Sequence, residues 1–530
     1  MIDILKPARY INSEWNAVHK KWEPGALKIA LAFPDVYEIG MSHLGMRILY
    51  GILNKEKDVI CERAFTPWPD MEKRLRDKKE NLSSLESGRP LKEFDIIGFS
   101  LQYEMNYLDV LNILDLGGIK VYSKDRQEGG PIVIAGGPCA FNPEPLTDFI
   151  DAFVIGEAEE VMLEIINAAR GSMLKAPGSR ENFLKEISRI QGIYVPAFNL
   201  QPSTFSLKKR IVKDLDNSFF PTNIIVPYIQ ITHDRIGIEI MRGCPHQCKF
   251  CQACKIFYPL RIRSVKRIME IAEESVKNTG YEELSLLSLS SGDYPHIEEL
   301  AGKLEEKFKL LGVKVSLPSL RVGSFEERGG MDTLKRAGLT FAPEAGSERL
   351  RHALNKNIRD AEILEKSRTA LNAGWKKVKL YFMIGLPGET SEDLDAIVNL
   401  AGKIKNVNLS VNPFIPKPHS DFEREGMEGL EILKEKQGRL SSRLQAKGSR
   451  IKANFHSPET SRIEAALARG DKNTGRVILK AWEKGLRLQA WTEHFNYNLW
   501  DQAFQETGID PEIYLKKKET GENLPWGFIV

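Results

Sequence analysis

The sequence predicts an α/β protein in which two series of alternating strands and helices are followed by a smaller helical part. Three observations carry this prediction: a strand–helix series before residue 170, a second series from residue 236, and a cysteine-rich loop after the first strand of the second series. The chain has 530 residues, 42% hydrophobic and 28% charged, which suits a globular protein of several domains. The expected domains are 1–185, 233–425 and 426–530, with a connecting region at 186–232.

The first series contains short, nearly all-apolar segments that alternate with helical patterns. Such strands indicate a parallel sheet covered by helices on both faces, as in doubly wound, Rossmann-type folds. Ligands of these folds bind at the carboxyl ends of the strands, where Gly-rich turns fall in this chain. No Gly-x-Gly-x-x-Gly follows the first strand, which argues against an ordinary dinucleotide site. The expected strands are 29–33, 96–101, 132–135 and 152–156, and the expected helices are 40–53, 107–116 and 157–169.

The second series has the same alternation of strands and helices, with more strand–helix units. Its apolar segments are again separated by patterns with apolar residues at helical spacing. Beyond Phe422 this rhythm stops, and three helical segments suggest a small C-terminal domain with Trp482, Trp491 and Trp500 in its core. The expected strands are 236–241, 284–289, 313–317, 339–343, 378–384 and 409–414, the expected helices between them include 265–277, 297–310 and 361–373, and the C-terminal segments are 463–467, 477–482 and 498–504.

The loop after the first strand of the second series carries the chemistry. Cys244, Cys248 and Cys251 are separated by three and then two residues, and Phe250 immediately precedes the third cysteine. Thiolates at this spacing on one tight loop can each bind a different iron of a 4Fe–4S cubane. Three ligands for four irons leave one iron open. An open iron can chelate the amino and carboxylate groups of S-adenosylmethionine (SAM) and pass an electron to its sulfonium.

Other interpretations of these cysteines have to be weighed. Zinc sites usually pair two close cysteines with a distant second pair, whereas Cys61 and Cys139 are isolated and far upstream. The few cysteines and the lack of a signal-peptide pattern argue against disulfides. Cys254 has two alternatives. It fills the fourth iron position, which would abolish this chemistry, or it stays off the cluster, which we favour.

The Cys-x3-Cys-x2-Cys pattern with Phe250 before its last cysteine resembles the signature of the radical SAM superfamily. The six strand–helix units match the partial (β/α)6 barrel of that superfamily. Barrels place their chemistry on the loops at the carboxyl ends of strands, where the cysteine loop also falls. The resemblance implies a 4Fe–4S cluster held by Cys244, Cys248 and Cys251, with SAM bound next to it and Phe250 among the cofactor-binding residues.

Later strand ends resemble further elements of that superfamily. Ser290–Asp293 stands where a Gly-Gly-Glu-like element holds the methionyl amino group, and Asp293 would be its anionic partner unless it only caps a helix or turn. Pro343–Leu350, followed by Asn355-Lys356, looks like a Glu-Ser-Gly-Ser segment, in which Glu344 would bind ribose hydroxyls and Ser347 either binds SAM or caps a helix. Phe382–Thr390 resembles a Gly-Leu-Pro-Gly-Glu-Thr turn that lines the adenine pocket. The SAM-binding residues implied by this resemblance are Ser291, Gly292, Asp293, Glu344, Ser347 and Gly385.

The N-terminal domain is similar to cobalamin-binding domains. Asp35-Val36-Tyr37-Glu38-Ile39-Gly40 resembles their Asp-x-His-x-x-Gly loop, with Tyr37 in place of the histidine that ligates cobalt. Ser100, Gly136 and Gly137 fall on strand ends where that family surrounds the nucleotide tail. The resemblance implies base-off cobalamin whose lower face is capped by Tyr37 without histidine ligation, since a phenol with a pKa of about 10 is a poor neutral ligand. The alternative is a doubly wound domain that only docks on the barrel. The cobalamin-binding residues implied here are Asp35, Tyr37, Gly40, Ser100, Gly136 and Gly137.

Across nearly its whole length the chain looks like an uncharacterised family of radical enzymes with a cobalamin-type N-terminal domain. The implied function is cleavage of SAM to a 5′-deoxyadenosyl radical, with methyl transfer to an unactivated carbon if cobalamin is bound. The implied partner is an electron donor such as a flavodoxin or ferredoxin. The alternative from another class is a nucleic-acid-associated protein with a structural or sensory four-cysteine cluster. The substrate is not revealed by the sequence.

Charge and apolar runs limit the other partners. No apolar run is long enough to span a bilayer, so we expect a cytoplasmic protein without a membrane partner. The basic stretch Leu433–Lys452 is either an RNA-phosphate contact or, as we favour, a solvated helix face. Members of the resembled family continue past a Pro-Trp-Asp-His segment, whereas this chain stops at Pro525-Trp526-Gly527-Phe528. That difference favours a shortened form or a companion protein that supplies the missing half.

Overall fold

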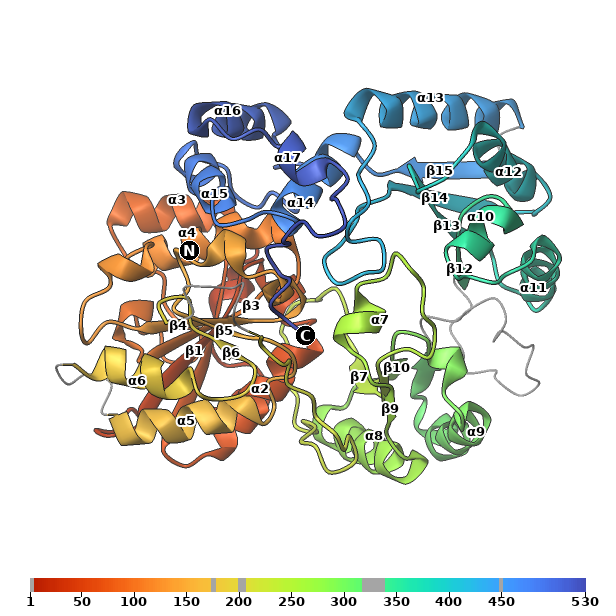
Figure 1. The fold of residues 1–530 in the computed structure, drawn as a ribbon. Coiled ribbons are helices and arrows are strands. Elements are labelled where there is room, and N and C mark those ends of the chain that lie inside the picture. The colour runs from red at the N-terminus through yellow and green to blue at the C-terminus, as the bar shows by residue number, and fades with distance from the viewer. Residues whose placement is uncertain (1–3, 173–177, 199–205, 317–338, 448–450) are drawn as a thin grey trace.

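The computed structural model describes residues 4–172, 178–198, 206–316, 339–447 and 451–530. Its N-terminal part is a six-stranded sheet of order β2-β1-β3-β4-β5-β6 (Figure 1), in which only the β5–β6 pair is antiparallel. The strands are β1 (Leu27–Phe33), β2 (Val59–Phe65), β3 (Ile96–Ser100), β4 (Ile132–Gly136), β5 (Ala152–Val154) and β6 (Ile193–Tyr194). The helices are α1 (Tyr37–Gly40), α2 (Leu44–Lys55), α3 (Pro69–Lys78), α4 (Tyr107–Leu116), α5 (Val161–Ser172) and α6 (Ser179–Ile187).

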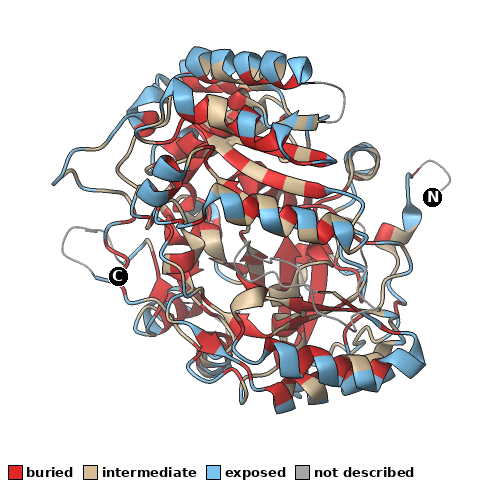
Figure 2. Cartoon of the chain, turned by 90° about the vertical axis from the view of Figure 1, so that its right-hand side faces the viewer, coloured by how far each residue is buried: buried red, intermediate tan, exposed pale blue. Residues whose placement is uncertain are grey.

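Helices cover both faces of this sheet, as its apolar strands predict. Leu31 and Phe33 of β1 pack in one buried cluster with α2, α5 and α6, while Ala30 and Ala32 pack in another with α4. The two sets alternate because successive side chains of a strand point to opposite faces. Figure 2, which views the molecule from the side of residues 236–455, shows buried strands beneath helices with exposed outer sides in that part of the chain as well. The doubly wound fold class is therefore confirmed.

The sequence pattern does not predict two strands of this sheet, β2 and β6. The apolar run of β2 is interrupted by Glu62 and Arg63, yet every residue of the strand is buried. Arg63 is tolerated there because it forms ion pairs with Glu14 and Glu86. β6 extends the sheet to Tyr194, beyond the expected boundary at residue 185.

The central part contains all six expected strands. Within the described residues they lie in two parallel sheets, of order β11-β10-β7 and β12-β13-β14-β15, and β15 is an additional strand. Part of the expected strand 313–317 reaches Leu317, which is outside those residues. The strands are β7 (Ile236–Glu239), β8 (Met241–Arg242), β9 (Arg261–Ile262), β10 (Glu283–Leu287), β11 (Lys314–Ser316), β12 (Leu339–Glu344), β13 (Val378–Ile384), β14 (Val407–Pro413) and β15 (Ile451–Phe455). The helices are α7 (Ala253–Ile256), α8 (Val265–Thr279), α9 (Ile297–Phe308), α10 (Glu348–Ala353), α11 (Asp360–Asn372), α12 (Ser391–Gly402) and α13 (Leu430–Ala446).

The barrel sheet continues past the boundary expected at residue 426. β15 pairs in parallel with β14, and α13 packs Leu433, Leu440 and Leu444 into the same buried cluster as β13 and β14. Residues 430–455 are thus a further helix–strand unit of the barrel rather than the start of a helical domain. The sequence hides β15 because its exposed Lys452 and Asn454 alternate with only partly buried residues.

The basic residues of α13 pair with acids from other elements. Lys436 contacts Glu389 and Glu428, and Arg439 contacts Asp395. In the fold, acids from outside the helix therefore offset the excess of positive charge seen in the local sequence. Arg450, within the same basic stretch, lies outside the described residues. These contacts support the interpretation of α13 as a barrel-covering helix, while binding of RNA stays an untested prediction.

The C-terminal helices share the core of the N-terminal domain. Leu467, Val477 and the fully buried Trp500 belong to the cluster that contains α4. Figure 1 shows α15 and α16 above α4, so the C-terminal helices lie against the N-terminal domain. The C-terminal elements are α14 (Pro458–Ala468), α15 (Thr474–Glu483), α16 (Tyr497–Thr507) and α17 (Glu512–Leu515).

Candidate active site

The cysteine loop is held between β8 and β9, which form an antiparallel ribbon. It starts at Gly243, whose φ is +90°. A Cβ at this position would lie 2.9 Å from the carbonyl oxygens of Phe257 and Pro259. Only glycine lets the start of the loop approach its end this closely. The short helix α7 then carries the chain from the last cysteines back to β9.

The thiols of the loop differ in their ease of ionisation. All six cysteines of the chain are described and none forms a disulfide. The side chain of Cys254 hydrogen-bonds Cys251, and together with backbone N–H groups it lowers the pKa of Cys251 to about 6, while the pKa of Cys254 itself is raised. The Cys254 sulfur lies 3.0 Å from the carbonyl oxygen of Cys251. This arrangement favours a thiolate at Cys251 and a protonated thiol at Cys254.

The donor set fits a cubane rather than a single ion. Within the described residues, no three His, Cys, Asp or Glu side chains lie close enough together to chelate one metal ion. A cubane does not require such convergence, because each thiolate binds a different iron. Cys248 is buried and Cys244 and Cys251 are partly exposed, all on the same loop. These three cysteines are the residues that would hold a 4Fe–4S cluster.

The loop after β10 is tied directly to the cysteine loop. His246 Nε2 lies 2.9 Å from Asp293 Oδ2, and Ser290 donates a hydrogen bond to the same carboxylate. Ser291 donates a hydrogen bond to the carbonyl of Leu286 at 3.2 Å. Gly292 lies between Ser291 and Asp293 in a 3-10 turn. Asp293 is therefore bound to the cysteine loop through His246, which the sequence motif did not single out, and its contact with SAM stays a prediction.

The end of β12 meets the cysteine loop through a lysine. Lys356 is buried and pairs with Glu344 at 2.7 Å, and its Nζ lies 5.8 Å from the ring centre of Phe250. Glu344 has a φ of +71°, which is uncommon for a residue with a side chain. Asn355 donates to the carbonyl of Gln247 at 2.7 Å. Asn355 and Lys356 thus connect the cysteine loop to the segment after β12, and Lys356 positions Glu344.

An apolar cluster joins the same strand ends. Phe250 packs against buried side chains that follow β12, β13 and β14. Apolar contact of this kind excludes water from the loops around the cysteines. The sequence could have indicated this cluster, because its members lie at or after the ends of expected strands. Its buried members are Ala345, Leu350, Leu354, Leu386 and Phe414.

Two of the expected SAM-binding residues have structural roles. Ser347 caps α10 by accepting a hydrogen bond from the N–H of Leu350 at 3.1 Å, and it also donates to Asp393. Gly385 has a φ of +77°, and its N–H donates to Glu389 at 3.0 Å, so it shapes the turn after β13. The capping alternative for Ser347 is confirmed, and the direct contact of either residue with SAM stays a prediction.

The N-terminal sheet has an apolar cavity of about 290 Å³ at its carboxyl edge. Ser100, Gly136 and Gly137 line it, together with Gly98 in the middle of β3. Gly137 has a φ of +108°, and a Cβ there would lie 2.5 Å from the carbonyl oxygen of Leu101. Glycines inside or directly after strands leave room for a ligand to approach the backbone closely. Three of the six residues expected around cobalamin therefore share one cavity.

The other three residues lie elsewhere. Tyr37 is 2% exposed and donates to Glu14 at 2.7 Å, and burial with the charge of Glu14 raises the pKa of its phenol far above the usual range. Asp35 is buried and accepts a hydrogen bond from the indole of Trp491 at 2.9 Å. Gly40 faces the Phe65 ring, which a Cβ would contact at 2.3 Å. The Tyr37 hydroxyl is thus bound inside the domain and Tyr37 does not line the cavity, while its place at the lower face of cobalamin stays a prediction.

His43 takes a place in the cavity instead. It lies three residues after Gly40, lines the cavity and accepts a hydrogen bond from the N–H of Met46 at 3.2 Å through Nδ1. Its ring also hydrogen-bonds Gln102, and burial lowers the pKa of the imidazole to about 4. His43 is therefore neutral at pH 7, with both ring nitrogens in hydrogen bonds. The sequence analysis missed it because it lies outside the Asp-x-Tyr-x-x-Gly loop.

The barrel forms part of the same cavity. Glu239, Arg242 and Phe257 line it together with Glu157 and Glu159 from the N-terminal domain. Arg242 directly precedes the cysteine loop, and its ion pairs with Glu157, Glu159 and Glu239 have N···O distances of 3.1, 2.7 and 2.8 Å. Arg242 thus connects the two domains through its ion pairs. It lines the apolar cavity and directly precedes the cysteine loop in the sequence.

These features define a radical SAM protein. Residues 45–196 match the family described as "Radical SAM proteins, N-terminal", and residues 238–401 match "Radical SAM superfamily". The chain is 33% identical over 470 residues to "Uncharacterized protein MJ0966" of Methanocaldococcus jannaschii, which covers 85% of this chain and 90% of that protein. The chain belongs to the radical SAM superfamily, whose members use a 4Fe–4S cluster and SAM.

Further similarities are more distant. "Uncharacterized methyltransferase PH0819" of Pyrococcus horikoshii is 24% identical over 376 residues, 68% of this chain and 73% of that protein. The structure of TsrM, a radical SAM methyltransferase of Kitasatospora setae with tryptophan and a SAM analogue bound, aligns with a TM-score of 0.55 at 12% identity over 91% of this chain and 100% of that one. A second TsrM structure, with cobalamin and a [4Fe–4S] cluster, gives 0.52 at 14% identity over 73% and 75%. At these identities the structural likeness establishes the fold. No described helix has the length and apolar character needed to cross a membrane.

Proposed function

We propose that this chain is a radical SAM methyltransferase that binds cobalamin between its N-terminal sheet and its barrel. The observation that carries the proposal is the apolar cavity of about 290 Å³, which has room for the nucleotide tail of cobalamin and whose walls come from both domains, including Arg242 at the start of the cysteine loop. The likeness in fold to TsrM and the description of the P. horikoshii relative as a methyltransferase also support it.

Each group of residues has a defined task in this proposal. Bound cofactors would supply the reactivity, namely reductive cleavage of SAM to a 5′-deoxyadenosyl radical and a methyl group for an unactivated carbon. Cys244, Cys248 and Cys251 would hold the cluster, while the protonated Cys254 stays off it. Glu344, positioned by Lys356, offers a carboxylate to SAM hydroxyls. The apolar strand ends exclude water from the radical.

The cobalamin part has a direct test in Gly98. Gly98→Val should weaken the binding of hydroxocobalamin about tenfold or more, because a side chain from the middle of β3 would occupy the cavity. Tyr37→Phe is the matched control and should bind like the wild type, since Tyr37 points to Glu14. The visible spectrum during titration of the cluster-loaded protein measures both. Absence of binding by the wild type would leave the N-terminal domain a docking platform.

The role of Cys254 separates the enzyme from the structural-cluster alternative. Cys254→Ala should retain iron, sulfide and SAM cleavage, because the Cys254 thiol is hydrogen-bonded to Cys251 rather than required as a fourth ligand. Iron and sulfide analysis after anaerobic reconstitution, with assay of 5′-deoxyadenosine, measures the outcome. Loss of the cluster in this variant, or a response to SAM that the wild type lacks, would establish four-cysteine ligation.

A further inference from the structure

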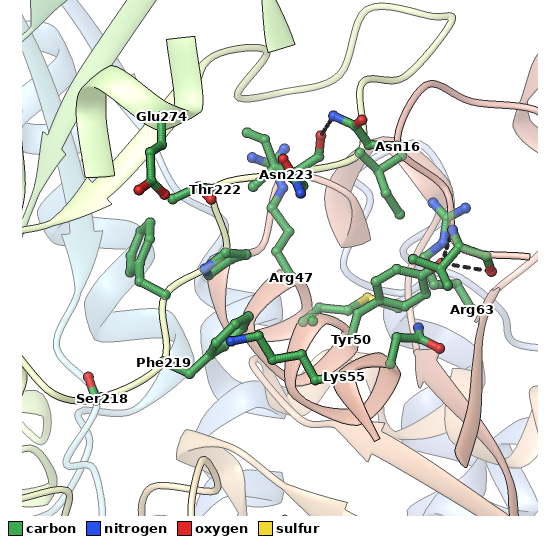
Figure 3. Close-up of a pocket in the computed structure, with 18 of the residues that line it drawn as sticks. Asn16, Arg47, Tyr50, Lys55, Arg63, Ser218, Phe219, Thr222, Asn223 and Glu274 are labelled. Carbon is green, nitrogen blue, oxygen red and sulfur yellow. Dashed lines mark hydrogen bonds between the residues drawn. The ribbon is translucent and has the colours of Figure 1, made fainter. Parts of the chain in front are cut away.

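A second cavity lies between α2, the 217–225 segment and α8, and its volume is about 640 Å³ (Figure 3). Its lining residues do not include the cysteine loop or the strand ends that surround the expected SAM position. This volume is in the usual range for sites of small organic ligands. The proposed methyltransferase chemistry gives this cavity no task.

Its lining is rich in cationic side chains. Arg47 and Lys55 come from α2 and Arg267 from α8, while the acid of the described lining, Glu274, is exposed on α8. Arg63 also lines the cavity, but Glu14 and Glu86 balance its charge. Arg267 is itself paired with Glu270 at 3.1 Å, so Arg47 and Lys55 are the cations of this lining that form no ion pair within the described residues.

Two of these cations have buried donors without partners. Arg47 Nη2 and Arg267 Nε are buried and make no hydrogen bond within the described part of the chain. Arg47 is held at its Nε by the carbonyl of Met41 at 2.9 Å, and Figure 3 shows its side chain extending from α2 toward the segment that carries Asn223. Leaving a buried donor unsatisfied is costly, and native proteins rarely do so without a functional reason. A ligand with acceptor oxygens at the Arg47 guanidinium would satisfy its free donor.

Part of the cavity lining is aromatic and lies beside the cations. Phe219 packs on α2 at Gly51, where a Cβ would lie 2.7 Å from its ring, and Lys55 Nζ lies 4.4 Å from the ring centre. Glycine in the middle of a helix is less favourable than alanine, so this contact explains its presence. Tyr50 adds a second ring to the lining. The wall thus offers a flat apolar surface beside the cations.

We propose that this cavity binds a small organic phosphate or diphosphate. Guanidinium groups match phosphate oxygens in geometry and charge, and Arg47, Arg267 and Lys55 would hold that group. Phe219 and Tyr50 would contact the organic part of the ligand. Because the cavity joins α2 to α8, its occupation would also bind the N-terminal domain to the barrel at a point separate from the cluster.

Calorimetric titration with inorganic pyrophosphate and with ADP, at fixed ionic strength on the cluster-loaded full chain, tests the proposal. Both should bind, and ADP should bind more tightly because it adds an organic part. Arg47→Gln and Lys55→Gln should each weaken binding about tenfold, the effect of one lost charge-assisted contact. Lys57→Gln, an exposed lysine just beyond α2 and outside the cavity, is the matched control and should have no effect.

Three outcomes would overturn the proposal. The wild type could fail to bind either probe at millimolar concentration. Lys55→Gln and Lys57→Gln could weaken binding equally, which would indicate general charge attraction. ADP could bind no more tightly than pyrophosphate, which would remove the organic part of the proposal. Since Lys55 is exposed, its variant decides the question even if Arg47→Gln does not fold.

Discussion

Replacing Cys248 with alanine is expected to abolish the 4Fe–4S cluster and all cleavage of SAM. Cys248 is the buried member of the three-cysteine set, on a loop closed by Gly243, and the neighbouring thiol of Cys254 is already hydrogen-bonded to Cys251. Two thiolates cannot hold a cubane that needs three protein ligands to leave one iron open for SAM. Iron and sulfide content, visible absorption and production of 5′-deoxyadenosine measure the loss.

Cys139→Ala is the control for this experiment. Cys139 is also buried, but it lies in the N-terminal domain among the residues that pack on α4. This variant should load the cluster and cleave SAM like the wild type. Full iron content together with cleavage activity in Cys248→Ala would contradict the assignment of the cysteine loop.

Replacing Arg63 with methionine is expected to destabilise the N-terminal domain by about 3–5 kcal/mol. Arg63, Glu14 and Glu86 form a fully buried ion triad, with Arg63–carboxylate distances of 2.6 Å to each acid and side chains at most 2% exposed. Removing the cation leaves two buried carboxylates without a counter-charge, held only by hydrogen bonds such as those from the Tyr37 hydroxyl and the backbone N–H of residue 63. Hydrogen exchange of the β2 amides measures the effect locally, which avoids assuming two-state unfolding of a multidomain chain.

The triple variant Glu14→Gln, Arg63→Met, Glu86→Gln is the matched control. It removes the charges together and should recover most of the lost protection, because neutral amides cost far less to bury than unpaired carboxylates. Equal destabilisation of the single and triple variants would show that Arg63 acts through packing rather than through charge. Cobalamin binding should survive in the triple variant, since none of the three residues lines the apolar cavity.

The sequence by itself determined the parts that depend on local pattern. Apolar strands such as Ile132–Gly136 and Val378–Ile384 lie where their composition predicts, and α4 has the bounds that its periodicity indicates. The spacing of Cys244, Cys248 and Cys251 is sufficient to indicate the chemistry, because a tight loop can present only neighbouring thiols to one cluster. The capping role of Ser347 was also one of the two roles expected from its position ahead of a helix.

Only the tertiary structure decided which residues meet across long stretches of chain. The charges of β2 look unsuited to a buried strand until Glu14 and Glu86 lie beside Arg63, and the basic helix α13 looks free until acids of other elements pair with it. Tyr37 matched a family position in the sequence, yet its hydroxyl is bound to Glu14, and His43 occupies the cavity instead. Local sequence specifies backbone conformation and side-chain chemistry, whereas ion pairs, cavities and ligand sites depend on contacts between distant residues, which folding alone brings together.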